Sequence, residues 1–292
     1  MTRRDLLPAG LAMGPAAAAS LSAAAALSAA AQTGTAKKAK FKQAVCRGCF
    51  RRKGTPMTLD ESCKLAADLG IKGMDLVGPT DFPTLKKYGL VPTMLPSASG
   101  IRDGINRKEF HDKIEAGLRE SINQAAAAGS PNVIILSGER RGLSEEEGLD
   151  NSVALFNRVK AQAEDKGVTL AMELLNSKVN HPDYQCDHTK WGVEVCKRVG
   201  SSRVKLLYDI YHMQIMEGDV IRTIRDNHQW FAHYHTAGNP GRHELNDEQE
   251  IYYPAIARTL VEIGFTGFVA HEYTPLGDVT TALKQAIAAF DV

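Results

Sequence analysis

The sequence predicts an α/β fold in which eight parallel strands alternate with eight helices and close into a (β/α)8 barrel. Short apolar runs alternate with amphipathic stretches of helical length from residue 41 onward. Alternation of this kind is typical of a parallel sheet, and a series of eight such units closes it into a barrel. The length of 292 residues agrees, because barrels of this class commonly use about 250 residues as one domain.

The predicted strands are short apolar runs between polar or turn-forming residues. The first four occupy residues 42–50, 73–77, 91–95 and 132–137. The other four lie in the runs VTLAMELLN, VKLLYDIYHM, WFAHYHTAG and GFVAHEYTP. Each of these runs predicts a buried strand of about five residues.

The predicted helices carry start and stop signals. Thr58 with Glu61 three residues later is the pattern of a capping box, and Asp187 is predicted to cap a later helix. Gly129 and Gly167 follow the last residue of a helix and favour its end there. The predicted helices are 58–69, 82–88, 108–128, 150–166, 187–199, 219–227, 253–263 and 278–290.

Two polar segments lie between these elements. Residues 96–107 form a glycine-containing loop after the third strand and are a candidate lid, because loops that follow barrel strands lie over the mouth. Residues 144–147, with the sequence SEEE, are interpreted as a solvated helix start rather than as an acidic binding surface.

The first 31 residues are predicted to be a twin-arginine export signal that is cleaved. Arg3 and Arg4 precede a stretch rich in alanine, glycine and leucine, and the small residues at 28–31 suit signal peptidase. A membrane anchor is the alternative, but Pro8, Pro15 and the near absence of Ile, Val and Phe make the stretch weakly hydrophobic. We therefore expect a periplasmic protein without a stable membrane partner, with residues 32–40 as a leader and 41–292 as the barrel.

Composition excludes some functions. The chain has 35 Lys and Arg against 34 Asp and Glu, a net charge of +1, so it lacks the broad basic field that a nucleic acid partner requires. Cys46 and Cys49 form a C-x-x-C pair, but a zinc ribbon needs a second such pair, and a redox dithiol normally opens a helix. We interpret them as structural cysteines, and a disulfide between them stays open.

Four of the predicted strands carry, near their ends, a residue of the type that binds metals: Glu173, Asp209, His235 and Glu272. Side chains at the C-terminal ends of neighbouring barrel strands converge on one mouth, so these four would share one pocket. Three carboxylates within a few ångströms repel one another, and one divalent cation is the economical way to hold them together. Oxygen-rich ligation with one imidazole favours Mn²⁺ or Mg²⁺, with Co²⁺ and Zn²⁺ as the further candidates.

Several motifs resemble those of the hydroxypyruvate isomerase and ketose 3-epimerase branch of the xylose isomerase-like TIM barrels. They are ELLN (173–176), YDIYHM (208–213), HYH (233–235), NPGRHE (239–244) and GFVAHEY (267–273). The resemblance covers residues 45–290 as a pattern and is strongest from Glu173 onward. It implies a xylose isomerase-like barrel in which the four candidate ligands hold the metal. His235 is nearer the epimerases, whereas DIYHM and NPGRHE are nearer hydroxypyruvate isomerase.

The resemblance also implies roles for residues around the metal. His212 would donate to a substrate oxygen, and Arg242 would hold a substrate hydroxyl or carboxylate. Asn176 would either hold Glu173 or touch the substrate. His271 alternates to the other face of its strand and is predicted to pack or to support a ligand rather than to bind metal.

The predicted activity is that of a metal-dependent isomerase or epimerase acting on a small α-hydroxycarbonyl compound, either hydroxypyruvate or a free ketose or aldose. Glu173 and Glu272 would be the catalytic pair, one removing a proton and the other returning it through an enediolate. Two alternatives stay open: a lyase acting on 3-keto-glycosides, and a non-catalytic periplasmic sugar-binding barrel. Related barrels often form dimers or tetramers, so the resemblance also implies a homo-oligomer.

Overall fold

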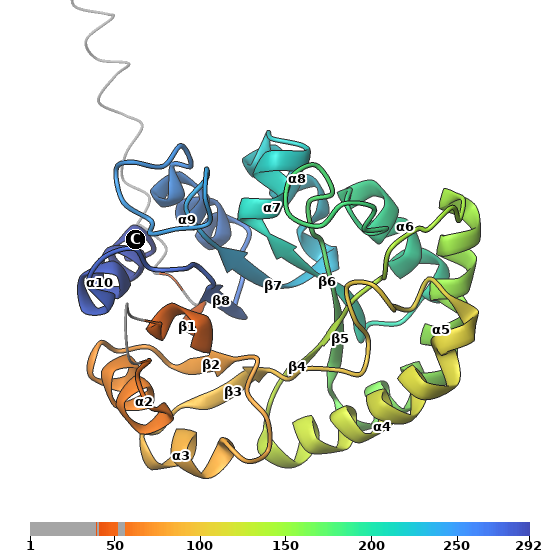
Figure 1. The fold of residues 1–292 in the computed structure, drawn as a ribbon, viewed down its shortest axis with the longest axis horizontal. Coiled ribbons are helices and arrows are strands. Elements are labelled where there is room, and N and C mark those ends of the chain that lie inside the picture. Colours follow the sequence, from red (N-terminus) through yellow and green to blue (C-terminus); the bar gives the residue numbers. More distant parts are fainter. Residues whose placement is uncertain (1–38, 40, 52–55) are drawn as a thin grey trace, which may run out of the picture. The chain divides into compact units, whose positions relative to one another are not determined.

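Strands surround a central axis, and helices cover their outer side, in the computed structural model, which describes residues 39, 41–51 and 56–292 (Figure 1). The fold prediction is confirmed. The predicted export signal at 1–31 and leader residues 32–38 and 40 lie outside the described residues. Within the described part of the chain the strands are β1 (Lys42–Cys46), β2 (Gly73–Asp75), β3 (Val91–Met94), β4 (Asn132–Ile135), β5 (Thr169–Glu173), β6 (Val204–Asp209), β7 (Phe231–Thr236) and β8 (Phe268–His271).

The sheet is parallel throughout, in the order β3-β2-β1-β8-β7-β6-β5-β4. Strands β3 and β4, at the two ends of this order, meet through Leu95. The amide of Leu95 donates to the carbonyl of Asn132 at 3.0 Å, and the amide of Ile134 donates to the carbonyl of Leu95 at 2.9 Å. These hydrogen bonds join the two ends of the sheet into a barrel.

The helices lie outside the strands (Figure 1). No helix among the described residues has the length and apolar character needed to cross a bilayer. In the same residues the α-helices are α2 (Leu59–Asp68), α3 (Phe82–Lys87), α4 (His111–Ala128), α5 (Glu145–Lys166), α6 (Thr189–Val199), α7 (Ile210–Met216), α8 (Val220–Asn227), α9 (Tyr253–Glu262) and α10 (Val279–Ala289), and the 3-10 helices are η1 (Arg47–Phe50), η2 (Lys108–Phe110) and η3 (His228–Trp230).

The predicted capping box is present at the start of α2. The amide of Thr58 donates to Glu61 Oε2 at 2.7 Å, and the amide of Glu61 donates to Thr58 Oγ1 at 3.2 Å. Gly129 and Gly167 end α4 and α5 with φ values of 70° and 69°. Glycine adopts this left-handed conformation without strain, which explains why both helices stop where the sequence predicts.

Several predicted details are wrong. The first strand ends at Cys46 rather than at residue 50, because η1 begins directly after it. Helix α5 begins at Glu145 rather than at residue 150, because the Ser144 hydroxyl accepts from the amide of Glu147 and caps it there. The helix start predicted at residues 144–147 is therefore confirmed. Helix α7, directly after β6, was not predicted at all. It can start at once because the Asp209 carboxylate that ends the strand also caps the helix.

Asp187 does not cap α6, contrary to the prediction. Helix α6 begins at Thr189 with His188 at the N-cap position. The Asp187 carboxylate instead accepts from Arg140 Nη2 at 2.9 Å and from Ser177 Oγ at 2.6 Å. A charged, partly exposed partner therefore holds this carboxylate away from the helix end.

Alternate residues of each strand fill the inside of the barrel. Met94, Ile134, Ala171 and Leu207, from the four neighbouring strands β3 to β6, form a small buried cluster apart from the main core. Ala44, Phe268 and Ala270 form a similar cluster from β1 and β8. Because successive strand residues point to opposite faces, the residue two positions after each of these also points inward. This alternation decides which side chains reach the mouth of the barrel.

Candidate metal centre

The four predicted ligands stand inside the barrel at the C-terminal ends of β5 to β8. Glu173, Asp209 and Glu272 each lie two positions after a residue of the interior clusters, so the strand pleat directs them inward. His235 joins them from β7. One donor atom from each of the four lies within 4.8 Å of the donor atoms of the other three. The structure therefore brings together all four residues to which the sequence assigned a metal.

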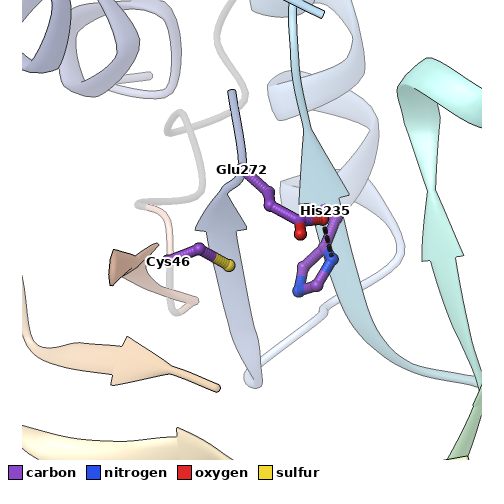
Figure 2. Close-up of side chains that lie close together, drawn as sticks. All are labelled: Cys46, His235 and Glu272. Carbon is purple, nitrogen blue, oxygen red and sulfur yellow. Dashed lines mark ion pairs between the residues drawn. The ribbon is translucent and has the colours of Figure 1, made fainter. Parts of the chain in front are cut away.

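His235 lies between the carboxylates. Its Nδ1 atom is 2.9 Å from Glu272 Oε2 and 3.3 Å from Glu173 Oε1, and Figure 2 shows the Glu272 carboxylate directed at the ring. Its Nε2 atom is 2.9 Å from Asp75 Oδ2. An ionised carboxylate only accepts hydrogen bonds, so Nε2 carries the proton, and in the neutral ring Nδ1 keeps its lone pair.

The residues fit a divalent cation. Nδ1 of His235 is buried and makes no hydrogen bond, although two carboxylate oxygens face it. A lone pair and anionic oxygens at these distances repel one another, so a positive charge belongs between them. Without a cation, a second proton on His235 can supply this positive charge. Burial lowers the pKa of His235, but the charges of Cys46 and Glu272 and the hydrogen bond to Asp75 raise it well above its usual value.

The carboxylates resist ionisation unequally. Burial raises the pKa of Asp209 to about 7 and also raises the pKa of Glu173. Burial acts the same way on Glu272, but the neighbouring His235 and Arg242 outweigh it and lower its pKa to about 2. A pocket in which two of three carboxyl groups are hard to ionise is one that a divalent cation would stabilise.

Asp75, at the end of β2, bonds to the His235 nitrogen that faces away from the other ligand candidates, and it was not identified from the sequence. Its Oδ2 accepts from Nε2 of His235 at 2.9 Å and from Nε2 of His233 at 2.7 Å, and Thr93 donates to its other oxygen. A carboxylate behind a metal-binding imidazole commonly fixes its tautomer and orientation. The signal was available, because Asp75 closes a buried strand just as the four candidate ligands follow theirs.

His212 presents a single N–H group next to Asp209. The amide of Asn176 donates to Nδ1 of His212 at 3.2 Å, so the ring proton is on Nε2. Nε2 is buried, has no hydrogen-bond partner, and lies 3.7 Å from Asp209 Oδ2. Burial and the nearby Arg242 lower the pKa of His212 well below its usual range, so the ring is neutral.

Asn176 uses its amide within the protein. Its Oδ1 accepts from the amides of Val179 and Asn180 at 3.0 and 2.8 Å, and its Nδ2 donates to Asn180 Oδ1 at 2.7 Å. These bonds shape the loop after β5 and place Asn176 against His212. The predicted contact of Asn176 with substrate stays a prediction.

Arg242 reaches the ligand group from the loop after β7. Its Nη2 atom donates to Glu272 Oε2 at 2.8 Å and lies 3.9 Å from Asp209 Oδ2. The guanidinium also lies over the ring of Tyr211, 5.9 Å from the centroid. About a quarter of its side chain, 27%, is exposed. Arg242 therefore extends from the carboxylates of Glu272 and Asp209 to the exposed mouth of the barrel.

The neighbouring strand residues do not enter the group. His271 faces away, as predicted, and pairs with Thr236 Oγ1 at 2.9 Å and Gln43 Oε1 at 3.0 Å.

All five cysteines are buried and free, so Cys46 and Cys49 form no disulfide. Cys46 instead points toward His235 and Glu272 (Figure 2), a position that the sequence analysis missed.

The candidate lid, residues 96–107, is bound to the end of β4 along its second half. The amide of Ile105 donates to Leu136 O at 3.3 Å, and the amide of Asn106 donates to Ser137 O at 2.8 Å. Gly104 sits against the backbone of Ser137 and Gly138, where any side chain would collide. The first half is held as well, because Ser99 Oγ accepts from the amide of Leu136 at 2.8 Å and the carbonyl of Pro96 accepts from Ser121 Oγ at 3.1 Å. The lid function stays a prediction.

The chain is similar in sequence to known isomerases. The chain is 30% identical over 233 residues to the 2-oxo-tetronate isomerase of Haemophilus influenzae, which covers 75% of this chain and 88% of that protein. It is 28% identical over 236 residues to the hydroxypyruvate isomerase of Escherichia coli, which covers 75% of this chain and 89% of that protein.

Solved structures share the fold. A family 2 AP endonuclease from Brucella melitensis superposes with a TM-score of 0.75 at 26% identity, covering 83% of this chain and 97% of that one. An L-ribulose 3-epimerase superposes with a TM-score of 0.70 at 19% identity, covering 85% and 92%. The model of one protein family, described as xylose isomerase-like TIM barrel, matches residues 63–291. Together with the parallel barrel and the candidate ligands gathered at its mouth, this match means that the chain belongs to the xylose isomerase-like TIM barrel family.

Proposed function

We propose that this protein is a metal-dependent isomerase or epimerase that moves a proton within a small α-hydroxycarbonyl compound. One observation carries the proposal. Two glutamates from different strands, the buried Glu173 and the partly exposed Glu272, approach the same nitrogen of His235, at 3.3 and 2.9 Å. Carboxylates that flank one centre can remove a proton from a substrate carbon and return it to the neighbouring carbon or to the opposite face.

Glu173, Asp209, His235 and Glu272 would hold one divalent cation, with Mn²⁺ or Mg²⁺ favoured by the oxygen-rich ligands. When bound, it supplies positive charge next to the substrate oxygens and stabilises the negative charge that builds there as a proton leaves carbon. The protein's own residues do the rest: they orient the substrate, exclude water and carry the proton.

His212 and Arg242 would orient the substrate. The buried Nε2–H of His212 has no partner within the described residues and is free to donate to a substrate carbonyl or hydroxyl oxygen. Arg242 is partly exposed and offers its remaining N–H groups to a hydroxyl or a carboxylate. Both residues lie beside Asp209, so substrate held by them would lie next to the glutamates.

The substrate class follows from the relatives and the arginine. The curated relatives that align over most of their length are named for 2-oxo-tetronate and hydroxypyruvate, both short oxo acids that carry hydroxyl groups. An arginine at the mouth suits their carboxylate. We therefore place a small hydroxy-keto acid first and a free ketose or aldose second.

Proton NMR in D₂O tests the proposal. Metal-loaded protein is incubated with hydroxypyruvate, 2-oxo-tetronate and a panel of ketoses and aldoses, beside the Glu173→Gln and Glu272→Gln variants. Deuterium should enter the substrate with the wild-type protein and with neither variant. The position of the deuterium distinguishes the two reactions. An isomerase would place it on the carbon next to the one that loses its proton. An epimerase would place it on the same carbon, with inverted configuration.

Absence of exchange over the whole panel would contradict the proposal. Release of the aglycone from a 3-keto-glycoside would then identify the lyase alternative. Saturable sugar binding without any chemistry would identify a binding protein.

We also propose that the protein is exported to the periplasm through the twin-arginine pathway. Arg3 and Arg4 before a weakly hydrophobic stretch support this. Changing both arginines to lysine should leave the protein in the cytoplasmic fraction, whereas export of that variant would contradict the assignment.

A further inference from the structure

Cys46 places a thiol beside the candidate metal centre, and the proposed reaction does not use it. It ends β1, two positions after Ala44 of the interior cluster, and is buried. Figure 2 shows its sulfur on the side of the pocket where His235 and Glu272 lie. The sulfur, one nitrogen of His235 and one oxygen of Glu272 lie within 4.8 Å of one another. Zinc–ligand bonds are about 2.0–2.3 Å in a tetrahedral site, so two ligands of one ion are about 3.3–3.8 Å apart, and these donors need to approach one another by at most about 1.5 Å.

This second set of donors differs in chemistry from the first. The first set has three carboxylates and one imidazole, and Cys46 does not belong to it. Carboxylate ligands suit Mg²⁺ and Mn²⁺, whereas a thiolate selects softer ions such as Zn²⁺. The two sets share His235 and Glu272. The pocket therefore offers a hard and a soft coordination environment built on the same two residues.

Two further observations distinguish Cys46 from a merely packed thiol. His235 Nδ1 is fully buried without a hydrogen-bond partner, so the shared imidazole has an unused donor atom. Cys49, three residues later, is equally buried but has partners, since its sulfur donates to the carbonyl of His271 at 3.2 Å and accepts from the amide of Tyr273 at 3.3 Å. Cys49 is thus held by the backbone, whereas Cys46 is directed at the ligand group.

We propose that Cys46, His235 and Glu272 form a second coordination set that takes a thiophilic divalent cation such as Zn²⁺ or Cd²⁺ and competes with the oxygen-preferring cation for this pocket. As the metal–sulfur bond forms, the thiol proton leaves to solvent. A cation held in this way engages Glu272 and would therefore block the proton transfer of the proposed function. The binding itself does not depend on that function.

Spectroscopy with Cd²⁺ tests the ligand. Chelator-treated full-length protein is titrated with Cd²⁺, and the near-ultraviolet thiolate-to-metal charge-transfer band is recorded. The band should appear in the wild type, be lost in Cys46→Ser and persist in Cys49→Ser, the matched control for a buried thiol. Cys46→Ser should also bind Cd²⁺ at least about tenfold more weakly, because the soft ligand is gone. Mn²⁺ affinity, measured by electron paramagnetic resonance, checks that this variant is folded and retains the first set.

Displacement tests the competition. Protein loaded with Mn²⁺ should release it as Cd²⁺ binds, giving the sharp spectrum of free Mn²⁺. A charge-transfer band that persists in Cys46→Ser, or none in the wild type, would overturn the assignment of the ligand. Cd²⁺ binding with full retention of Mn²⁺ would overturn the competition.

Discussion

The side chain of Asp75 accepts a hydrogen bond from Nε2 of His235 at 2.9 Å, and this bond determines which imidazole nitrogen faces the carboxylates. We predict that Asp75→Asn weakens Mn²⁺ binding by about 10–100-fold, the usual effect of losing such a supporting carboxylate. Isothermal titration calorimetry measures the affinity. Asp187→Asn is the matched control, because it removes another buried carboxylate outside the ligand group. Equal affinities in Asp75→Asn and wild type would show that His235 needs no such support.

His212 should act on substrate rather than on metal. We predict that His212→Asn lowers kcat/KM by about 10–100-fold, because its hydrogen bond to a substrate oxygen that gains negative charge would contribute about 1.5–3 kcal/mol. Its Mn²⁺ affinity should stay close to that of the wild type. His188→Asn, at a half-exposed imidazole that faces Asp187, is the control for the substitution itself. A large loss of Mn²⁺ affinity in His212→Asn would place this residue among the ligands instead.

Removal of metal should cost stability, because three carboxyl groups, two of them buried, then crowd one imidazole. A cation present at about a hundredfold excess over its Kd stabilises the folded state by about 2.7 kcal/mol. We predict that a chelator lowers the Tm of the wild type in differential scanning calorimetry. Asp209→Asn should lose most of the Mn²⁺-induced rise in Tm and yet melt above the wild type when both are metal-free at pH 8, since one repelling charge is gone. If chelator leaves the wild-type Tm unchanged, the group holds no metal under those conditions.

Acid should loosen the loop at residues 96–107 through His111. This imidazole is buried, its Nε2 bonds to the carbonyl of Ile105 at 2.9 Å, and burial lowers its pKa from 6.5. Because the unfolded chain binds the proton more readily, stability is complete above about pH 6.5 and falls as the pH drops toward the folded-state pKa. Urea unfolding at pH 7.5 and 5.5 should show a smaller difference in His111→Gln than in the wild type. His228→Gln, at an exposed site, should keep the full difference.

The sequence predicted the barrel and the grouping of the four candidate ligands, because both depend on local patterns. Apolar runs with period-two alternation locate strands, and Glu173 or Asp209 at the end of such a run must reach the mouth once the barrel closes. Contacts between distant strands could not be predicted in this way. Asp75 and His235 are far apart in sequence, and although Asp75 ends a buried strand, neither segment indicates that these two side chains pair. The position of Cys46 beside His235 and Glu272 was missed for the same reason, since its C-x-x-C partner Cys49 suggested a local role.

The errors in helix boundaries have a similar cause. Asp187 has the residue type of an N-cap, but Arg140, from a different loop, binds its carboxylate. Asp209 has two tasks, as candidate ligand and as cap of α7, and a single sequence signal did not separate them. Tertiary partners decide such cases, and a propensity calculated along the chain does not contain them.

The hydrogen bonds at Leu95 that join β3 to β4 give the ring a single weak seam. Every other junction between neighbouring strands is a ladder of three or four paired residues. Here the backbone pairing is limited to Leu95, and the Asn132 side chain adds one bond to the carbonyl of Thr93 at 3.0 Å. Local opening should begin there, and amide exchange at Leu95 and Ile134 would reveal it first. The four candidate ligands come from β5 to β8, away from β3. The barrel can therefore open locally between β3 and β4 while the strands that carry the candidate ligands keep their register.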